Sequence, residues 1–141
     1  MALNRNRYSS IIAVRPDDLD LFGHVHSSRY MDYFLAARFD QMGRCYGMGM
    51  QEFLDNGYAW YMLKFDIAYK RGLGLGESVK VFTWLEEFNS YHVLINFEMR
   101  HPETDKVICL GISEFGLVSL ASQKSIKIPD WVLERYQDDA L

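Results

Sequence analysis

The chain has 141 residues, a length that suits one domain with a real hydrophobic core. Hydrophobic residues make up 49% of it and charged residues 24%, a composition that excludes a disordered chain. Its net charge is −4 and its basic residues form no dense cluster, so it lacks the electrostatic footprint of a nucleic-acid-binding protein. We therefore expect a single domain over residues 1–141 and no nucleic-acid partner.

Cysteine content and hydropathy favour a cytoplasmic protein. Two cysteines, Cys45 and Cys109, do not make a disulfide framework, which fits a reduced, intracellular setting. Residues 1–14 hold only a short apolar piece after two arginines, so no signal peptide is expected. No apolar run approaches the ~20 residues of a membrane-spanning helix, so no membrane span is expected either.

The N-terminal third predicts a short strand, a polar loop and one long helix. Residues 8–14 are typical of a short strand, and residues 15–26 form a loop rich in aspartate and histidine. Ser27 and Ser28 are good N-capping residues, and the segment from there to about residue 46 contains no proline. One helical face is formed by Tyr30, Phe34, Ala37 and Gln41. Because most other positions are also apolar, we expect this helix to be buried on most sides.

The rest of the chain predicts an antiparallel sheet with two short helices. Residues 59–70 alternate between apolar and polar, the period of a half-buried strand. Three further strands are expected at 79–86, 91–99 and 107–120. Short helices are expected at 50–55 and after Ile128-Pro129-Asp130. A single long helix lying on an antiparallel sheet is an α+β domain.

Three carboxylates lie close together in the loop before the long helix, on Asp17, Asp18 and Asp20. Like charges this near raise one another's pKa, and a helix N-terminus supplies free backbone N–H groups. A carboxylate that faces such a terminus can direct water at a carbonyl carbon while the amides hold the oxyanion. A purely structural interpretation also fits the spacing, with Asp20 capping the turn and His24 packing against it.

Residues 18–34 read Asp-Leu-Asp-Leu-Phe-Gly-His-Val-His-Ser-Ser-Arg-Tyr-Met-Asp-Tyr-Phe, and Ala37-Arg38 follow. This stretch resembles the active-site signature of the 4-hydroxybenzoyl-CoA thioesterase family. That signature is Asp-x-Asp-x-x-Gly-His-Val-Asn-Asn-x-x-Tyr, followed by an aromatic helix that ends in Ala-Arg. The turn from Tyr69 to Glu77 and the ending at Ile128-Pro129 are also similar to the family's. The resemblance covers most of the chain and implies the hotdog fold, a long central helix wrapped by an antiparallel sheet.

The resemblance implies hydrolysis of an acyl-CoA to a carboxylic acid and free CoA. Asp20 matches the family's catalytic carboxylate, acting as base or nucleophile, and the backbone amide of Ser27 would polarise the thioester carbonyl. His24 is grouped with these two catalytic positions. The expected substrate-binding residues are Gly23, His26 and Tyr30. No cofactor is implied, and a site built between protomers implies a homodimer or homotetramer.

The chain departs from the family pattern at His26 and Ser27, which replace the usual Asn-Asn pair, and this leaves the substrate class open. Candidate phosphate contacts are Lys70, Arg71 and Arg100. An acyl pocket or simple core packing explains Met48, Met50 and Phe53 equally well. Arg38 is expected to be a structural ion-pair partner.

Other sites are less favoured. Asp20, His24 and His26 suit a zinc or iron ion, but no third or fourth ligand is evident beyond them, so no metal is expected. Asp32 and Asp40 lie on the helix, where a catalytic carboxylate also occurs in other hotdog enzymes, although solvated charges explain them better. Residues 111–116 do not form the elbow of a serine hydrolase.

Three rival functions remain. The first is a non-hydrolytic acyl-binding hotdog module, which the presence of Asp20 disfavours. The second is a hotdog dehydratase, whose paired histidine and carboxylate motif is not found. The third is a thioesterase that acts on acyl-carrier protein instead of CoA, which the sequence does not distinguish.

Overall fold

The computed structural model describes residues 2–138. Two 3₁₀ turns, Pro16–Asp18 and Ser27–Arg29, flank the loop before the long helix. The main elements follow in the order β1 (Tyr8–Ala13), α1 (Tyr30–Arg44), α2 (Met50–Asp55), β2 (Tyr58–Tyr69), β3 (Ser78–Phe88), β4 (His92–Arg100), β5 (Val107–Ser119) and α3 (Asp130–Arg135). They confirm the predicted α+β order, with boundaries shifted by one or two residues.

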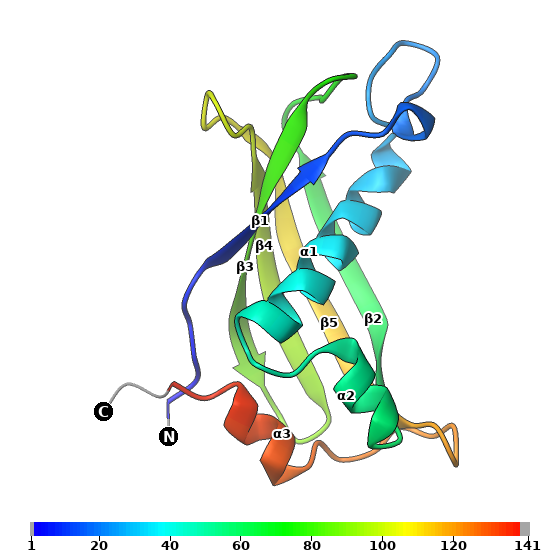
Figure 1. Ribbon diagram of the computed structural model, residues 1–141, viewed down its shortest axis with the longest axis vertical. Helices are drawn as coiled ribbons and strands as arrows, with labels where there is room; N and C mark the ends of the chain where they lie inside the picture. Colours follow the sequence, from blue (N-terminus) through cyan, green and yellow to red (C-terminus); the bar gives the residue numbers. More distant parts are fainter. Residues whose placement is uncertain (1, 139–141) are drawn as a thin grey trace.

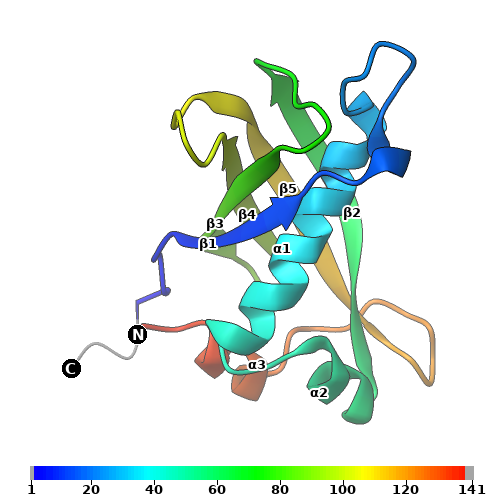
Figure 2. The same ribbon diagram turned by 45° about the horizontal axis from the view of Figure 1, so that its top comes forward.

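The five strands form one antiparallel sheet in the order β1-β3-β4-β5-β2. Helix α1 lies across one face of this sheet, and α2 and α3 lie at the end where α1 finishes (Figure 1). The loop that precedes α1 is at the opposite end, as the turned view in Figure 2 also shows. The sheet order leaves β1 and β2 as edge strands, each paired on one side only.

Aromatic rings join α1 to the sheet. All four residues of the predicted helical face are buried, and Phe34 has no exposed surface. The Phe34 ring lies 5.5 Å from the ring of Phe65 on β2 and 5.0 Å from that of Phe97 on β4. Phe65 and Phe97 stack on each other at 5.0 Å. Offset aromatic contacts of this kind contribute beyond their buried area and fix α1 in the middle of the sheet.

One side of α1 is open, contrary to the expected burial on most sides. Leu35 is 39% exposed and Phe39 63% exposed in the single protomer. The sheet has one concave face, and α1 can present only part of its circumference to it. The apolar residues that remain form an exposed stripe, which is the kind of surface that marks an interaction site.

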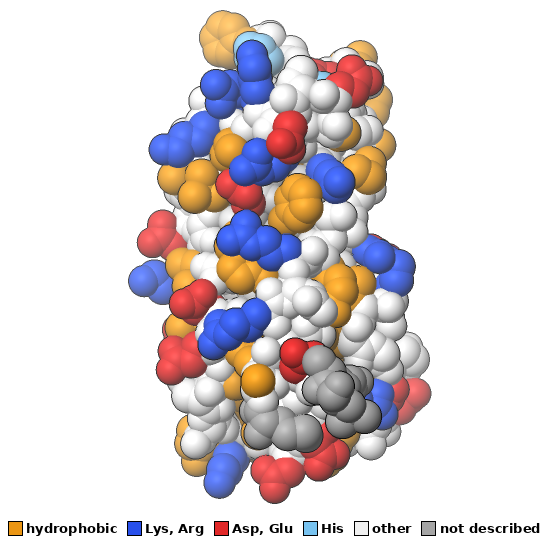
Figure 3. Space-filling view, turned by 90° about the vertical axis from the view of Figure 1, so that its left-hand side faces the viewer, with side chains coloured by type: hydrophobic (Ala, Val, Ile, Leu, Met, Phe, Trp, Pro, Cys, Tyr) orange, Lys and Arg blue, Asp and Glu red, His pale blue; other side chains and the backbone are white. Residues whose placement is uncertain are grey.

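The face beside the β1 edge carries a mixed surface. Figure 3 shows Lys and Arg side chains there, separated by acidic and hydrophobic ones. No continuous basic patch of the kind that phosphate backbones attract forms on this face. Within residues 2–138, no helix is both long enough and apolar enough to cross a membrane.

Gly111 on β5 is required by the close approach of β2. A Cβ atom there would overlap the backbone carbonyl of Asp66 and lie 2.9 Å from the Phe97 ring. We expect Gly111→Ala to lower the free energy of unfolding by about 1–3 kcal/mol, because the strands must separate to admit the methyl group. Urea unfolding measures this.

Gly43→Ala is the control for that substitution. A Cβ at Gly43 meets nothing closer than 3.9 Å outside the backbone of its own helix. The change should be neutral or stabilising by up to ~1 kcal/mol, because alanine is the better helix former. Equal unfolding free energies for the two variants would contradict the tight packing of β2 on β5.

Candidate active site

The loop before α1 is anchored by Asp18, whose side chain is fully buried. Its carboxylate accepts hydrogen bonds from the backbone N–H of Arg15 at 3.2 Å and from the Arg15 guanidinium at 3.1 and 3.2 Å. The hydroxyl of Tyr33, which projects from α1, donates to the same carboxylate at 2.7 Å. The Asp18 backbone carbonyl accepts the N–H of His26 at 2.9 Å. Asp18 therefore ties the start of the loop to its end and to the helix.

Burial of Asp18 raises the pKa of its carboxyl, but the hydrogen bonds from Arg15 and Tyr33 outweigh burial and hold that pKa below its usual value. Clustering of like charges was expected to raise it. The expectation fails for Asp18 because the carboxylate is surrounded by donors instead of by the neighbouring aspartates. The pKa of Tyr33 shifts in the opposite direction, because burial and the hydrogen bond to Asp18 both raise it.

Asp20 is half-buried and is held by the loop itself. One carboxylate oxygen, Oδ1, accepts the backbone N–H groups of Phe22 at 2.9 Å and His24 at 3.2 Å. The turn closes through the N–H of Asp20, which donates to the His24 carbonyl at 2.7 Å. Gly23 has φ of +78°, a left-handed conformation that glycine adopts without strain. Among the described residues, Oδ2 has no hydrogen-bond partner and is therefore free for a water molecule or substrate.

His26 caps the helical segment that begins at Ser27. Its ring Nδ1 accepts the backbone N–H of Ser28 at 3.1 Å and lies 2.8 Å from the Ser28 hydroxyl. An Nδ1 that accepts an N–H carries no proton, so the ring proton is on Nε2. Histidine thus performs the capping that the family's asparagine would perform. Ser27 is the first residue of the turn, where a backbone N–H has no acceptor inside the helix.

A polar, open cleft of about 460 Å³ brings these groups together. Four of the six predicted site residues line it, namely Asp20, His26, Ser27 and Tyr30. Burial raises the pKa of Tyr30 to about 12, so its hydroxyl stays protonated at neutral pH. The cleft therefore combines a carboxylate with a free oxygen, the start of a helix and a buried phenol.

The two other predicted residues support the loop and do not line the cleft. His24 contributes its backbone N–H and carbonyl to the turn around Asp20, while its ring lies beside Gly72. Gly23 shapes the same turn through its positive φ. Neither residue is among those that line the cleft.

Tyr69, at the end of β2, begins the turn that resembles the family's, and it also lines the cleft, a role that was not expected for it. Its hydroxyl donates to the backbone carbonyl of Ser27 at 2.9 Å, and its ring lies 5.6 Å from that of Tyr30. Tyr69 therefore fixes the start of the helix against the sheet. The alternation of residues 59–70 places it on the inner face, but which helix turn it meets depends on long-range packing that the pattern does not show.

Basic residues stand at one rim of the cleft. Lys70 and Arg71 both line it, as the candidate phosphate contacts were expected to do. Arg100 does not, because its guanidinium is bound to the side chains of Glu98 at 3.1 Å and Asp105 at 3.4 Å. This leaves two of the three predicted cations beside the candidate site.

The carboxylates on the helix lie outside the cleft. Asp32 is exposed and pairs with Arg29 at 3.5 Å. Asp40 binds Arg44 and accepts the Ser10 hydroxyl at 2.6 Å, and these two hydrogen bonds lower its pKa. In residues 2–138, no group of three or more His, Cys, Asp or Glu side chains is placed to hold a metal ion.

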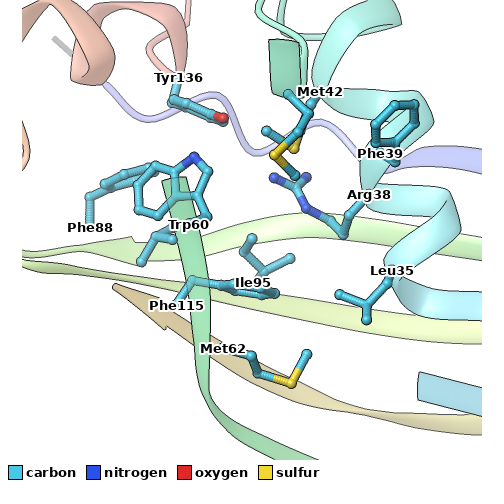
Figure 4. A pocket seen from close by; sticks show the side chains of 12 residues that line it. Leu35, Arg38, Phe39, Met42, Trp60, Met62, Phe88, Ile95, Phe115 and Tyr136 are labelled. Carbon is cyan, nitrogen blue, oxygen red and sulfur yellow. The ribbon is translucent and has the colours of Figure 1, made fainter. Parts of the chain in front are cut away.

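A second hollow lies further along α1, against the inner face of the sheet (Figure 4). Its volume is about 370 Å³ and its lining is almost wholly apolar. Met50 lines it, whereas Met48 and Phe53 are fully buried in the core. Arg38 also lines it, and the expected structural ion pair is not found among the described residues.

Replacing Asp18 should show its structural role. Asp18→Asn should lower the free energy of unfolding by about 1.5–3 kcal/mol at neutral pH, because hydrogen bonds to a charged group are lost. Since the folded pKa of Asp18 is lowered, its contribution is complete above the unfolded pKa of about 3.9 and is lost as the pH falls through the folded value. The difference between wild type and variant should therefore shrink below about pH 4.

Urea unfolding at a series of pH values measures this difference. Asp17→Asn is the matched control, because Asp17 is exposed and lies one residue away. A difference that does not depend on pH, or an equal loss in the Asp17 variant, would rule out the anchor.

Two variants test the cap at His26. His26→Ala should lower the free energy of unfolding by about 0.5–2 kcal/mol, the usual cost of losing an N-cap side chain. His26→Asn should retain most of that stability, because its Oδ1 can accept the same Ser28 N–H. Thermal unfolding of the three proteins decides the matter, and an Asn variant no more stable than the Ala variant would show that the ring does not act as a cap.

Known proteins resemble the chain in both sequence and fold. Residues 14–136 match the family described as "Thioesterase-like superfamily". The long-chain acyl-CoA thioesterase FadM of Escherichia coli (strain K12) is 21% identical over 126 residues, which cover 89% of this chain and 94% of FadM.

Two solved structures show the shared fold. The DHNA-CoA thioesterase of Staphylococcus aureus has a TM-score of 0.84 at 23% identity, covering 92% of this chain and 88% of the other. The protein SAV2348 of Staphylococcus aureus, solved in complex with CoA, has a TM-score of 0.79 at 14% identity, covering 100% and 92%. These likenesses confirm the predicted hotdog fold. Because the family match spans residues 14–136, the chain belongs to the thioesterase-like superfamily, a family of thioester hydrolases.

Proposed function

We propose that this protein hydrolyses an acyl-CoA thioester and that Asp20 is the carboxylate that drives the reaction. The observation that carries the proposal is the asymmetry of Asp20, with Oδ1 held by two backbone N–H groups and Oδ2 free in the cleft. An oriented carboxylate with one free oxygen can act as a general base on water or as a nucleophile. The resemblance to the 4-hydroxybenzoyl-CoA thioesterase family assigns the same role to this position.

The reaction on the water route has two steps. Water attacks the thioester carbon and gives its proton to Asp20 Oδ2, while the C=O electrons move to the carbonyl oxygen. The backbone N–H of Ser27, at the start of the helix, stabilises this oxyanion. The tetrahedral intermediate then collapses, the C–S bond breaks and the CoA sulfur takes the proton from Asp20. The products are a carboxylic acid and free CoA.

The two hollows suggest where each part of the substrate lies. Both hollows are lined by residues of α1 and β2. The cleft has Tyr30 and Tyr69 in its lining, and the apolar cavity has Leu35 and Met62. The apolar cavity suits the acyl group, and the cations on Lys70 and Arg71 suit the phosphates of CoA. The names of the relatives, which include CoA thioesterases, support CoA as the carrier.

A homodimer or homotetramer is the proposed functional state. The edge strand β2 has 12 residues and pairs on one side only, a surface that proteins cover or pair. Leu63 on that strand is 43% exposed, and Leu35 and Phe39 on α1 are also exposed. A partner protomer at this edge would cover these apolar side chains. The proposed location is the cytoplasm, because Cys45 and Cys109 are free thiols.

A non-hydrolytic acyl-binding module is the second candidate. The apolar cavity alone would serve binding without chemistry. The free Oδ2 of Asp20 favours hydrolysis, because a binding module has no need of an oriented carboxylate in a polar cleft. Acyl-carrier protein instead of CoA remains a candidate carrier, since Lys70 and Arg71 suit the phosphate of either.

Release of CoA thiol from a panel of short, long and aromatic acyl-CoAs tests the proposal. Asp20→Asn should lower kcat by about 10²–10⁴-fold, the usual contribution of a general base. Asparagine keeps an Oδ1 that can accept the Phe22 and His24 N–H groups, so the loop should stay folded. The variant thus removes the free carboxylate oxygen with little structural change.

Asp17→Asn is the control and should retain wild-type turnover, with circular dichroism confirming the fold of both variants. Wild-type release of CoA thiol by the Asp20→Asn variant would show that the proposed mechanism is wrong. Absence of turnover with every acyl-CoA would favour the binding module.

A further inference from the structure

Arg38 places a cation inside the apolar cavity, and no acidic side chain within residues 2–138 is seen to form an ion pair with it. The residue is 7% exposed, and its Nη1 is buried with no hydrogen-bond partner among the described residues. Figure 4 shows the guanidinium extending from α1 between Met42 and Trp60, in the direction of Tyr136. Its contact with the Tyr46 ring, at 5.6 Å from the ring centroid, is the cation–π interaction that partly stabilises it.

A buried guanidinium without an ion-pair partner lowers the stability of the folded protein, because the charge loses its hydration. Arginine stays protonated inside proteins, so it cannot reduce this desolvation penalty by becoming neutral. Buried charges in proteins are paired, or they meet a ligand. Arg38 Nη1 has no hydrogen-bond partner among the described residues, and a ligand in the cavity would supply one.

Two tyrosine hydroxyls beside Arg38 are also without partners. The hydroxyls of Tyr46 and Tyr136 are buried without a hydrogen bond of standard geometry, although Trp60 and Arg38 lie close enough to the Tyr136 hydroxyl to lower its pKa, and the two rings lie 4.9 Å apart. Burial raises the pKa of both phenols, to about 12 for Tyr46, while the Arg38 cation opposes that rise. Both hydroxyls therefore remain protonated donors at neutral pH. Together with Nη1 they offer three N–H or O–H groups and no anionic acceptor.

The remainder of the lining is apolar, including Trp60, Met62 and Ile95. An occupant must therefore combine an apolar chain with a compact group that accepts several hydrogen bonds. A carboxylate has this chemistry, because guanidinium binds it with two parallel N–H donors. A plain alkyl end would leave all three donors unpaired.

We propose that the cavity takes an acyl chain whose far end carries a carboxylate, and that Arg38 binds this carboxylate. The assignment of the chain to a thioester substrate rests on the proposed function, whereas the carboxylate site in the cavity does not. A free fatty acid, bound by its own carboxylate, is the other source of the same chemistry.

The length of α1 limits the chain. Eleven residues separate Ser27 from Arg38, or about 16 Å of helix. An extended chain advances about 3.6 Å for three backbone bonds, so at most ~13 bonds fit between the thioester and the guanidinium. Because helical side chains tilt toward the N-terminus, somewhat shorter chains should fit best.

The first experiment compares kcat/KM for pairs of acyl-CoAs of equal length, with and without a terminal carboxylate, from decanoyl to tetradecanoyl. Wild type should prefer the carboxylated chain by about tenfold or more, the effect of one charge-assisted hydrogen bond. Arg38→Met should lose that preference. Arg44→Met makes the same change on the exposed surface of the same helix and should keep it.

The second experiment measures binding without turnover, by calorimetry with dodecanoic acid and dodecan-1-ol. The acid should bind wild type and Arg44→Met about tenfold or more tightly than the alcohol, and Arg38→Met should bind both alike. Arg38→Met should also melt at a higher temperature than unliganded wild type, because an unpaired buried charge is gone. If that variant does not fold, Arg38→Lys replaces it. Lysine keeps the positive charge but lacks the two parallel N–H donors, so its preference for the acid over the alcohol should be weaker than that of wild type.

The two experiments together test the carboxylate site, the substrate assignment and the proposed function separately. Equal binding of acid and alcohol by wild type, or a preference that survives in Arg38→Met, overturns the carboxylate site. Binding that depends on Arg38 without any preference among thioesters assigns the site to a free fatty acid and overturns the substrate assignment. Binding that depends on Arg38 in a protein that hydrolyses no thioester overturns the proposed function and leaves the site standing.

Discussion

The buried carboxylate of Asp18 holds the loop, the helix and the sheet in one arrangement. It binds the Arg15 backbone at the end of β1, the Tyr33 hydroxyl on α1 and, through its carbonyl, the amide of His26 before the helix start. These bonds fix the path of the twelve residues from Arg15 to His26 between strand and helix, together with the backbone contacts of His24 and Val25 with residues 73 and 74. The position of Asp20 beside Ser27 follows from that path, because both lie on the segment that Asp18 closes.

Burial and hydrogen bonding give two carboxylates in the same short motif opposite roles. Asp18 has no exposed surface and uses both oxygens for structure, while Asp20 uses one oxygen for its turn and leaves the other free. A carboxylate saturated with donors is a weak base, as the lowered pKa of Asp18 shows. In the proposed mechanism the second aspartate of the motif therefore serves catalysis, while the first serves structure.

Local patterns predicted the fold well because each element depends on its own residues. The helical spacing of Tyr30, Phe34 and Ala37 fixes which side chains face inward, and the structure buries all three. The alternation of residues 59–70 predicted the inward face of β2 only beyond Leu63, because a β-bulge between Met62 and Lys64 changes the face: Trp60 and Met62 pack against the core, and Leu63 is 43% exposed. The loop motif likewise predicted Asp20, His26 and Ser27 as neighbours. The role of Tyr69 and the isolation of Arg38 were not predictable, because each depends on which residues from distant elements come within reach. An arginine in a helix ordinarily finds an acid nearby, and only the packed structure shows that this one does not.

Arg38 also shows how far the site departs from what stability alone would select. Replacing a buried unpaired charge by an apolar side chain often stabilises a protein, and methionine would fill the same space here. Arg38 lies in the second half of α1, six residues before the helix ends, so the proposed substrate path has a polar reaction end at Ser27 and a cation inside an otherwise apolar cavity. A chain that satisfies both ends at once is fixed in length and in direction, which positions its thioester beside Asp20 Oδ2. Specificity for the far end of the substrate would then act on the reaction itself, through the placement of the carbonyl carbon.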